Sequence, residues 1–273
     1  MNNYGKKNIP ATIILSIFAV VFILPLLYAL YTSFLKLSDI DKLVGIQHWT
    51  LESYLKFWKD PNYDIPRWFM NTVIMTLITV AGNVVINSMA GYALAKLKFP
   101  GKTLVFFIIV ATMTIPYQVV LIPVYVTMAK LNWLNTMASL TVPYLYQCLF
   151  VFMMKQFFQS IPNELLEAAR IDGLSKIGIF SRIMLPLSKP GIISMIILNF
   201  TSTWNAYLVP STMTSNSKSY VLIVGLNSVK DQFFDRTNVI MAGVVLITLP
   251  VILLFLIFQR HYIEGVATSG LKG

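Results

Sequence analysis

Long apolar runs alternate with short polar segments along the whole chain. Six runs contain no Asp, Glu, Lys or Arg, and each exceeds the roughly 20 residues that a helix needs to cross a bilayer. The runs are 8–35, 68–95, 103–129, 131–154, 190–217 and 237–259. One such run could be a buried core helix, but the remainder of the chain is too small to bury six. The pattern therefore predicts an all-α integral membrane protein with six transmembrane helices.

Prolines inside these runs predict irregular helices. We expect a kink at Pro25 in the first helix, and breaks in the third span before Pro116 and again before Pro123. The fourth span contains Pro143, and the fifth span is expected at 191–210. In the first outer segment, residues 50–58 predict a short amphipathic helix at the membrane surface. A docking surface for an external partner is the alternative for that helix.

Composition and charge agree with a membrane protein. The chain is 56% hydrophobic and 12% charged, whereas soluble domains carry about 25% charged residues. The net charge of +10 could indicate nucleic acid, but the positive-inside rule explains it better. With the N-terminus in the cytoplasm, the inner segments hold 12 of the 21 basic residues and only 4 of the 11 acidic ones. We therefore expect both termini inside and no nucleic-acid partner.

The candidate chemistry argues against an enzyme. The two histidines, His48 and His261, lie in separate polar segments, and no cluster of His, Cys, Asp or Glu has metal-ligand spacing. Cys148 is the single cysteine, so no intrachain disulfide can form. We expect no catalytic, cofactor or metal residue. The apolar runs also lack carboxylates and basic groups, which ion-driven carriers usually need.

The most polar loop predicted on the inner side is a helical hairpin at 160–190. Its first helix is expected to be capped by Ser160, with Pro162 in the first turn, and to end at Gly173 in a left-handed conformation. Ser175 is expected to cap a second helix, which Pro186 stops. The apolar face of this helix is predicted to carry Ile177, Phe180, Ile183 and Met184. Pro190 then opens the fifth span.

The hairpin resembles the signature loop of ABC-importer permeases. The resemblance rests on EAARIDG at 167–173, Ile183, and LPLSKPG at 185–191. The chain end adds Leu-Pro at 249–250, Gln-Arg at 259–260, Glu-Gly at 264–265 and Leu-Lys-Gly at 271–273. Together these segments resemble the smaller, maltose-type permease of carbohydrate importers over nearly the whole chain.

The resemblance implies a type I ABC importer permease fold and three segments. These are 1–66 (N-terminal tail, first helix and outer loop), 67–260 (a five-helix permease core containing the hairpin) and 261–273 (a cytoplasmic tail). It also implies a bacterial plasma-membrane protein that imports a sugar, expected to be an oligosaccharide, and forms half of the pathway. The implied partners are a second permease, a dimer of ATPase subunits that bind ATP and Mg, and an extracellular solute-binding protein.

The family motif also carries residue roles onto this sequence. It implies ATPase coupling through the 167–191 loop, by Glu167, Ala168, Ala169, Asp172, Gly173, Ile183 and Pro186, with Gly173 least replaceable. It implies ATPase contacts in the tail by Glu264, Gly265, Lys272 and Gly273. By position alone, an outer loop that reaches toward the binding protein is expected at Thr214, Ser215, Asn216 and Ser217.

Uncharged polar residues in the spans are candidates for lining a sugar pathway. They are Asn83, Asn87, Gln118, Asn199, Trp204 and Asn205. Interhelical hydrogen bonding is the alternative for the amides, and packing or an interfacial position is the alternative for Trp204. For the whole chain, the alternative to an ATP-driven importer is a secondary sugar transporter or channel that works alone.

Overall fold

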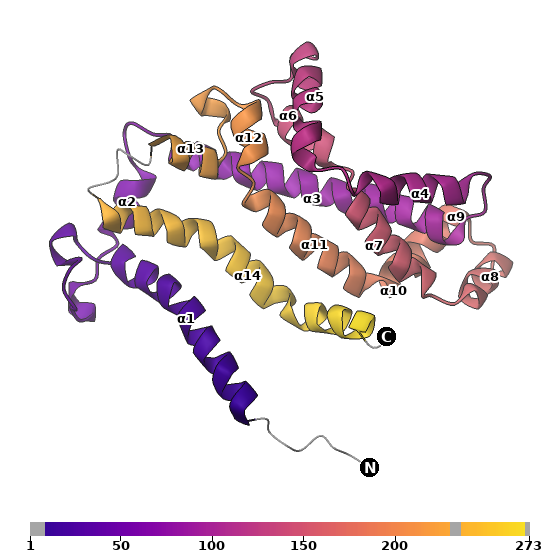
Figure 1. Cartoon of the computed structure of the whole chain (residues 1–273), viewed down its shortest axis with the longest axis horizontal. Coiled ribbons are helices and arrows are strands. Elements are labelled where there is room, and N and C mark those ends of the chain that lie inside the picture. Colours follow the sequence, from indigo (N-terminus) through magenta and orange to yellow (C-terminus); the bar gives the residue numbers. More distant parts are fainter. Residues whose placement is uncertain (1–8, 230–235, 271–273) are drawn as a thin grey trace. The chain divides into compact units, whose positions relative to one another are not determined.

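The structure is a computed structural model that describes residues 9–229 and 236–270, with side chains described for 10–229 and 236–259. Helices and turns, but no strand, make up these described ranges (Figure 1). Predicted residues Lys272 and Gly273 lie outside them, and Glu264 and Gly265 lie in the last helix without described side chains.

Three helices are long and apolar enough to cross a membrane on their own. They are α1 (Ile9–Ser33), α3 (Ile65–Lys96) and α14 (Thr237–Gly270), the last with its spanning part at Thr237–Gln259. Three bent helix pairs pass the same test when each pair is taken together. Counting each pair as one span gives the six spans that the sequence predicts.

The bent pairs differ in where they break. The first joins α4 (Lys102–Thr112) to α5 (Tyr117–Lys130) at 100°, and the second joins Met137–Tyr144 to α7 (Cys148–Gln159) at 42°. Met137–Tyr144 consists of α6 (Met137–Thr141) and a 3-10 turn (Val142–Tyr144). The third joins Lys176–Leu187 to α11 (Lys189–Trp204) at 77°.

Two predicted boundaries are wrong. The break before Pro116 is confirmed, but α5 continues through Pro123, because membrane helices tolerate an internal proline when neighbouring groups satisfy the freed backbone. The fifth span ends at Trp204 and not at residue 210. The side chain of Asn205 donates to the Thr201 carbonyl at 2.9 Å. This bond competes with the backbone hydrogen bonds that would continue the helix. Helix α12 (Leu208–Met213) then follows separately.

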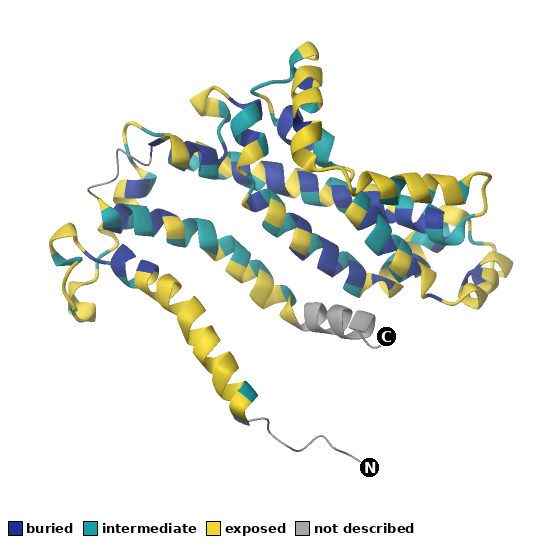
Figure 2. Cartoon of the chain, in the orientation of Figure 1, coloured by how far each residue is buried: buried dark blue, intermediate teal, exposed yellow. Residues whose placement is uncertain are grey.

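The chain divides into two compact units, 1–65 with 227–250 and 66–226 with 251–273. In the first unit, the predicted amphipathic helix forms as α2 (Glu52–Trp58). Buried Asn238 of α14 donates at 3.0 Å to the Leu35 carbonyl and at 3.0 Å to the Ser53 hydroxyl. Most of α1 is exposed although it is apolar on every side (Figure 2). Such a helix requires lipid or another protein around it.

The second unit has two apolar clusters. One lies toward the hairpin and includes Tyr92, Phe158, Ile179, Met184 and Met195. The other lies toward the outer loops and includes Met75, Leu121 and Met213.

The remaining helices of the described chain are the following: two 3-10 turns (Leu37–Asp39 and Ile46–His48), α8 (Asn163–Ile171), α9 (Lys176–Ile179), a π turn (Phe180–Met184), α10 (Leu185–Leu187), a 3-10 turn (Ser217–Ser219) and α13 (Leu222–Val229).

A buried glycine permits α3 and α7 to approach closely. A Cβ at Gly91 would lie 2.8 Å from the Met154 Cβ and 2.9 Å from the backbone nitrogen of Lys155. Because backbone cannot rotate away, we expect Gly91→Val to destabilise the fold by about 3 kcal/mol. At Gly82 of the same helix a Cβ would meet only the flexible end of Leu145, so Gly82→Val is the milder control. Thermal unfolding in detergent would measure both, and equal losses would contradict the close backbone contact.

Candidate functional site

The first helix of the hairpin ends at Gly173 in the conformation that the sequence predicts. Gly173 has φ +81°, its N–H donates to the Arg170 carbonyl at 3.0 Å, and the Leu174 N–H donates to the Ala169 carbonyl at 3.0 Å. This pair of bonds is the Schellman motif, which satisfies the last carbonyls of a helix and reverses the chain. No described atom lies within 4 Å of the place of a Gly173 Cβ, so the left-handed backbone is what favours glycine here.

The start of this helix differs from the prediction. Helix α8 begins at Asn163, and Pro162 occupies the cap position with φ −56° and ψ 141°. Ser160 instead ends α7, and its hydroxyl donates back to the Phe157 carbonyl at 2.8 Å. The prediction of Ser160 as the cap is therefore wrong, because the serine hydroxyl is used by the preceding helix.

The second helix begins at the predicted cap but has a different buried face. The Ser175 hydroxyl accepts a hydrogen bond from the Gly178 N–H at 3.1 Å. Ile177 is 77% exposed, whereas Ile179 and Met184 are fully buried. The expected face fails at Ile177 because the helix starts only at Lys176 and a wide π turn at Phe180–Met184 changes the spacing.

Pro186 does not stop the second helix. It lies within α10, and the chain bends at Ser188, directly before the helix that contains Pro190. A proline near the first turn of a helical segment loses no hydrogen bond there, so it permits the turn. Pro190 opens α11 as the sequence predicts.

The hairpin is fixed to the ends of the spans α3 and α7. Leu166 and Ala169 are buried in the cluster that includes Tyr92 and Phe158. The Lys96 ammonium, at the end of α3, donates to the Ile161 carbonyl and to the Asn163 amide oxygen at 2.8 Å. A displacement of the hairpin must therefore be transmitted to the ends of α3 and α7.

The coupling residues expected from the family motif have three kinds of environment. Glu167, Ala168 and Asp172 are exposed, Ala169 is buried, and Gly173 forms the turn between the helices. Ile183 is half-buried and Pro186 is exposed. Two further apolar side chains extend the exposed surface, since Leu165 is 46% and Ile171 is 87% exposed. The hairpin therefore presents an apolar surface that the described part of the chain does not cover.

A cavity of about 910 Å³ lies at the breaks of the bent spans. Its wall includes Tyr117 from the start of α5, Tyr144 and Tyr146 from the break before α7, and Gln147. The hydroxyls of Tyr117 and Tyr144 are hydrogen-bonded to each other. Tyrosine faces with amide and hydroxyl groups suit an uncharged, hydroxylated solute.

Sequence reasoning missed these tyrosines. Tyr117 and Tyr144 each follow a proline, Pro116 and Pro143, within an apolar run. A proline marks a break in a span, and a broken span directs irregular backbone toward a cavity or into the protein. That pair of Pro-Tyr steps is the signal that could have found them.

Two of the predicted pathway amides instead hold the broken fourth span in place. Asn83 donates to the Tyr144 carbonyl at 2.7 Å, and Asn87 donates to the Asn83 amide oxygen at 2.7 Å. The Gln147 N–H donates to the Asn87 amide oxygen at 3.1 Å. Asn83 and Asn87 are fully buried, and they satisfy backbone groups freed by the break. Asn83 and Asn87 therefore make hydrogen bonds between helices, which is the alternative that the sequence left open for these amides.

The other predicted pathway residues do not border this cavity. Trp204 is buried and stacks on Phe200, with ring centroids 5.5 Å apart, so it follows the packing alternative. Asn205 and Gln118 are exposed. Asn199 is fully buried, and neither of its amide atoms has a hydrogen-bond partner in the described part of the chain. A pathway role for these residues stays a prediction.

The predicted outer loop is held in a fixed shape by Asn135. The Asn135 amide oxygen accepts from the N–H groups of Ser215 at 2.7 Å and Asn216 at 3.0 Å. Trp68 adds a bond to the Ser217 carbonyl at 2.8 Å. Of the loop residues expected to reach a binding protein, Ser215, Asn216 and Ser217 are exposed and Thr214 is buried. The loop therefore presents an ordered surface.

Replacing Asn135 tests this arrangement. Asn135 and Asn132 both have left-handed backbones, at φ 60° and 56°, so glycine fits either position. We expect Asn135→Gly to destabilise the loop by about 1 kcal/mol because the N–H groups of Ser215 and Asn216 lose their acceptor. Limited proteolysis within 214–220 would measure this. Asn132→Gly is the control, since its side chain makes no hydrogen bond in the described structure, and equal cleavage of both variants would contradict the role of Asn135.

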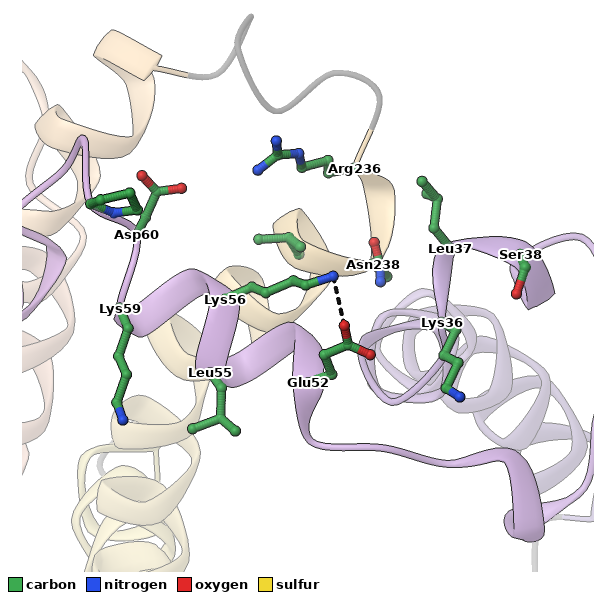
Figure 3. A pocket seen from close by; sticks show the side chains of 12 residues that line it. Lys36, Leu37, Ser38, Glu52, Leu55, Lys56, Lys59, Asp60, Arg236 and Asn238 are labelled. Carbon is green, nitrogen blue, oxygen red and sulfur yellow. Dashed lines mark ion pairs between the residues drawn. The ribbon is translucent and has the colours of Figure 1, made fainter.

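A second polar pocket, of about 740 Å³, lies in the first unit (Figure 3). Among the described residues, four basic and two acidic ones line it, namely Lys36, Lys56, Lys59, Arg236, Glu52 and Asp60. Lys56 and Glu52 form an ion pair at 2.7 Å. The hydrogen bond and charge of Lys56 hold the pKa of Glu52 below its usual value, so the pair is complete at neutral pH and is lost as the pH falls through that pKa.

The comparison with known families identifies the class of this protein. Residues 87–267 match the family described as "Binding-protein-dependent transport system inner membrane component". The match covers more than half of the chain, so the chain belongs to this family. It is a multi-pass membrane component of a binding-protein-dependent transport system.

Individual relatives are similar along most of their length. The chain is 34% identical over 206 residues to the arabinooligosaccharides transport system permease protein AraQ of Halalkalibacterium halodurans, covering 76% of this chain and 74% of that protein. It is 30% identical to the diacetylchitobiose uptake system permease protein NgcG of Streptomyces coelicolor, covering 94% and 86%. It is also 30% identical to the sn-glycerol-3-phosphate transport system permease protein UgpE of Yersinia pestis, covering 93% and 95%.

A solved structure shares the fold. One chain of the crystal structure of a bacterial ABC transporter involved in the import of the acidic polysaccharide alginate superimposes with a TM-score of 0.81 and 21% identity. The match covers 96% of this chain and all of that one. The chain therefore has the importer-permease fold that the sequence predicts.

Proposed function

We propose that this chain is one of two permease subunits of an ATP-driven oligosaccharide importer in a bacterial plasma membrane. It forms half of the pathway and is itself neither an enzyme nor a nucleotide-binding protein. ATP and Mg bind to a dimer of partner ATPases, and an extracellular solute-binding protein delivers the sugar. Relatives named for arabinooligosaccharides and diacetylchitobiose support an oligosaccharide as the substrate.

The hairpin is the observation that carries this proposal. Its exposed apolar side chains require a partner, and Leu166 and Ala169 fix it to the ends of the spans. Movement of a bound ATPase subunit would then move α3 and α7. Because the cavity wall at Tyr144 is hydrogen-bonded to α3 through Asn83, that movement reaches the solute cavity.

Purification of the tagged chain from its native membrane tests the proposal. We expect a second permease and an ATPase to co-purify in stoichiometric amounts. Recovery of the chain alone, together with sugar flux that needs no ATP, would support the stand-alone secondary transporter or channel instead.

The pocket of Figure 3 is a candidate docking site for the binding protein. Under the predicted orientation it faces the outside, and the surplus of basic residues in its described lining suits acidic side chains. We expect the charge reversal Lys59→Glu with Arg236→Glu to raise the binding-protein concentration for half-maximal uptake by about tenfold. Uptake into spheroplasts with added binding protein would measure the shift. Lys130→Glu, on the other unit, is the control, and an equal shift there would contradict docking at this pocket.

A further inference from the structure

A basic groove of about 450 Å³ lies between the hairpin and the turn that joins α3 to α4. Among the described residues, five cations border it, together with one carboxylate, that of Glu167. The cations are Lys96, Lys98, Lys102, Arg170 and Lys176. No ion pair links any of the five to an acid in the described part of the chain. The described lining of the groove therefore carries a net positive charge.

Two of the cations are held in place by neutral oxygens. Lys102 donates to the carbonyls of Ala95 at 3.2 Å and Leu97 at 3.0 Å. Lys96 bonds to Ile161 and Asn163, as described above. Bonds to carbonyls orient these ammonium groups without neutralising them. Lys98, Arg170 and Lys176 are exposed and complete the ring of charge.

The groove and the exposed apolar surface of α8 lie on opposite sides of that helix. At about 100° per residue, Asn163, Glu167 and Arg170 share one face, which borders the groove. Leu165 and Ala168 project from the other face and are exposed. An ATPase subunit that covers the second face and reaches Glu167 would leave open the side of the groove that Lys96, Lys98 and Lys102 form.

Its position places the groove at the membrane surface. The last residues of α3 and the first residue of α4, both spanning segments, form one wall. Under the predicted orientation this is the inner leaflet, where anionic phospholipids face the cytoplasm. Basic pockets at the inner ends of transmembrane helices bind anionic head groups, and each cation adds to the attraction.

We propose that this groove binds the phosphate head group of an anionic phospholipid of the inner leaflet. The head group would contact Lys98 and Arg170 and would stabilise the hairpin against the ends of the spans. The proposal rests on the predicted orientation and not on sugar import. It can therefore fail while the proposed function holds.

Lipid retention on the purified full-length chain, with any subunits that co-purify, tests the proposal. Native mass spectrometry would compare phosphatidylglycerol with phosphatidylcholine of the same acyl chains. We expect preferential retention of phosphatidylglycerol, and a loss of affinity of about tenfold in the double variant Lys98→Gln, Arg170→Gln. The matched control is Arg182→Gln, Lys189→Gln, which removes two exposed cations of the same predicted inner surface outside the groove.

Four results would overturn the proposal. Equal retention of the two lipids would show that the groove does not select an anionic head group. Equal losses in the test and control variants would show a diffuse surface charge. Full displacement of phosphatidylglycerol by millimolar inorganic phosphate would assign the groove to a soluble anion. Loss of a co-purifying ATPase from the Lys98→Gln, Arg170→Gln variant, with lipid retention unchanged, would assign the groove to that partner.

Discussion

Gly173→Val is expected to lower ATP-dependent uptake by about tenfold or more while the chain still inserts into the membrane. The reason is the backbone at φ +81°, which a β-branched residue adopts only with strain of about 1–2 kcal/mol. The Schellman bonds at Arg170 and Ala169 would then be lost, and the angle between the two hairpin helices would change. Sugar uptake into vesicles and ATPase activity would be measured on the same preparation. A loss of uptake while ATP hydrolysis continues would show that the two are uncoupled.

Two controls separate the turn from general damage to the hairpin. Gly173→Asn adds a side chain but tolerates a left-handed backbone, so most of the uptake should remain. Gly178→Ala changes a glycine in the next helix that has no positive φ, and near-normal uptake is expected. Normal uptake and normal assembly in Gly173→Val would show that the hairpin does not couple the ATPase to the spans.

Tyr117→Ala is expected to lower sugar uptake by about tenfold without a change in ATPase assembly. The variant removes an aromatic face of the cavity and the hydroxyl that bonds to Tyr144, and an aromatic contact of this kind contributes about 1 kcal/mol or more. Tyr117→Phe keeps the face and should retain most of the uptake. Initial uptake rates across sugar concentrations would separate binding from turnover.

A neighbouring tyrosine provides the matched control. Tyr125 lies on the same helix and is 37% exposed, the same fraction as Tyr117, but it lies outside the cavity wall. We expect Tyr125→Ala to transport normally. Equal losses at Tyr117 and Tyr125 would mean that the cavity is not the pathway.

The sequence predicted the features that depend on local chemistry. Charge-free runs located the six spans, and Gly173 and Ser175 were identified because a left-handed turn and a helix cap each require particular residue types. The cap at Ser160 and the stop at Pro186 failed because the neighbouring helical turns absorbed these residues. Local propensity does not decide between adjacent helices that compete for one side chain.

Features formed by distant segments were not predictable in this way. Asn135 and the 214–220 loop are about 80 residues apart in sequence, and the cavity tyrosines come from two separate breaks. The basic groove joins the α3–α4 turn to the hairpin. Each depends on which segments pack together, and a single sequence does not state that.

Reconstitution of the co-purified complex into proteoliposomes tests the central claim most directly. The probes are radiolabelled arabinotriose, diacetylchitobiose and maltotriose, with binding protein outside and ATP inside. The account predicts that at least one sugar accumulates inside the proteoliposomes. This accumulation should require both ATP and the binding protein, and the variant Gly173→Val should reduce it. Sugar movement by this chain alone, without ATP and unaffected by the hairpin variant, would contradict it.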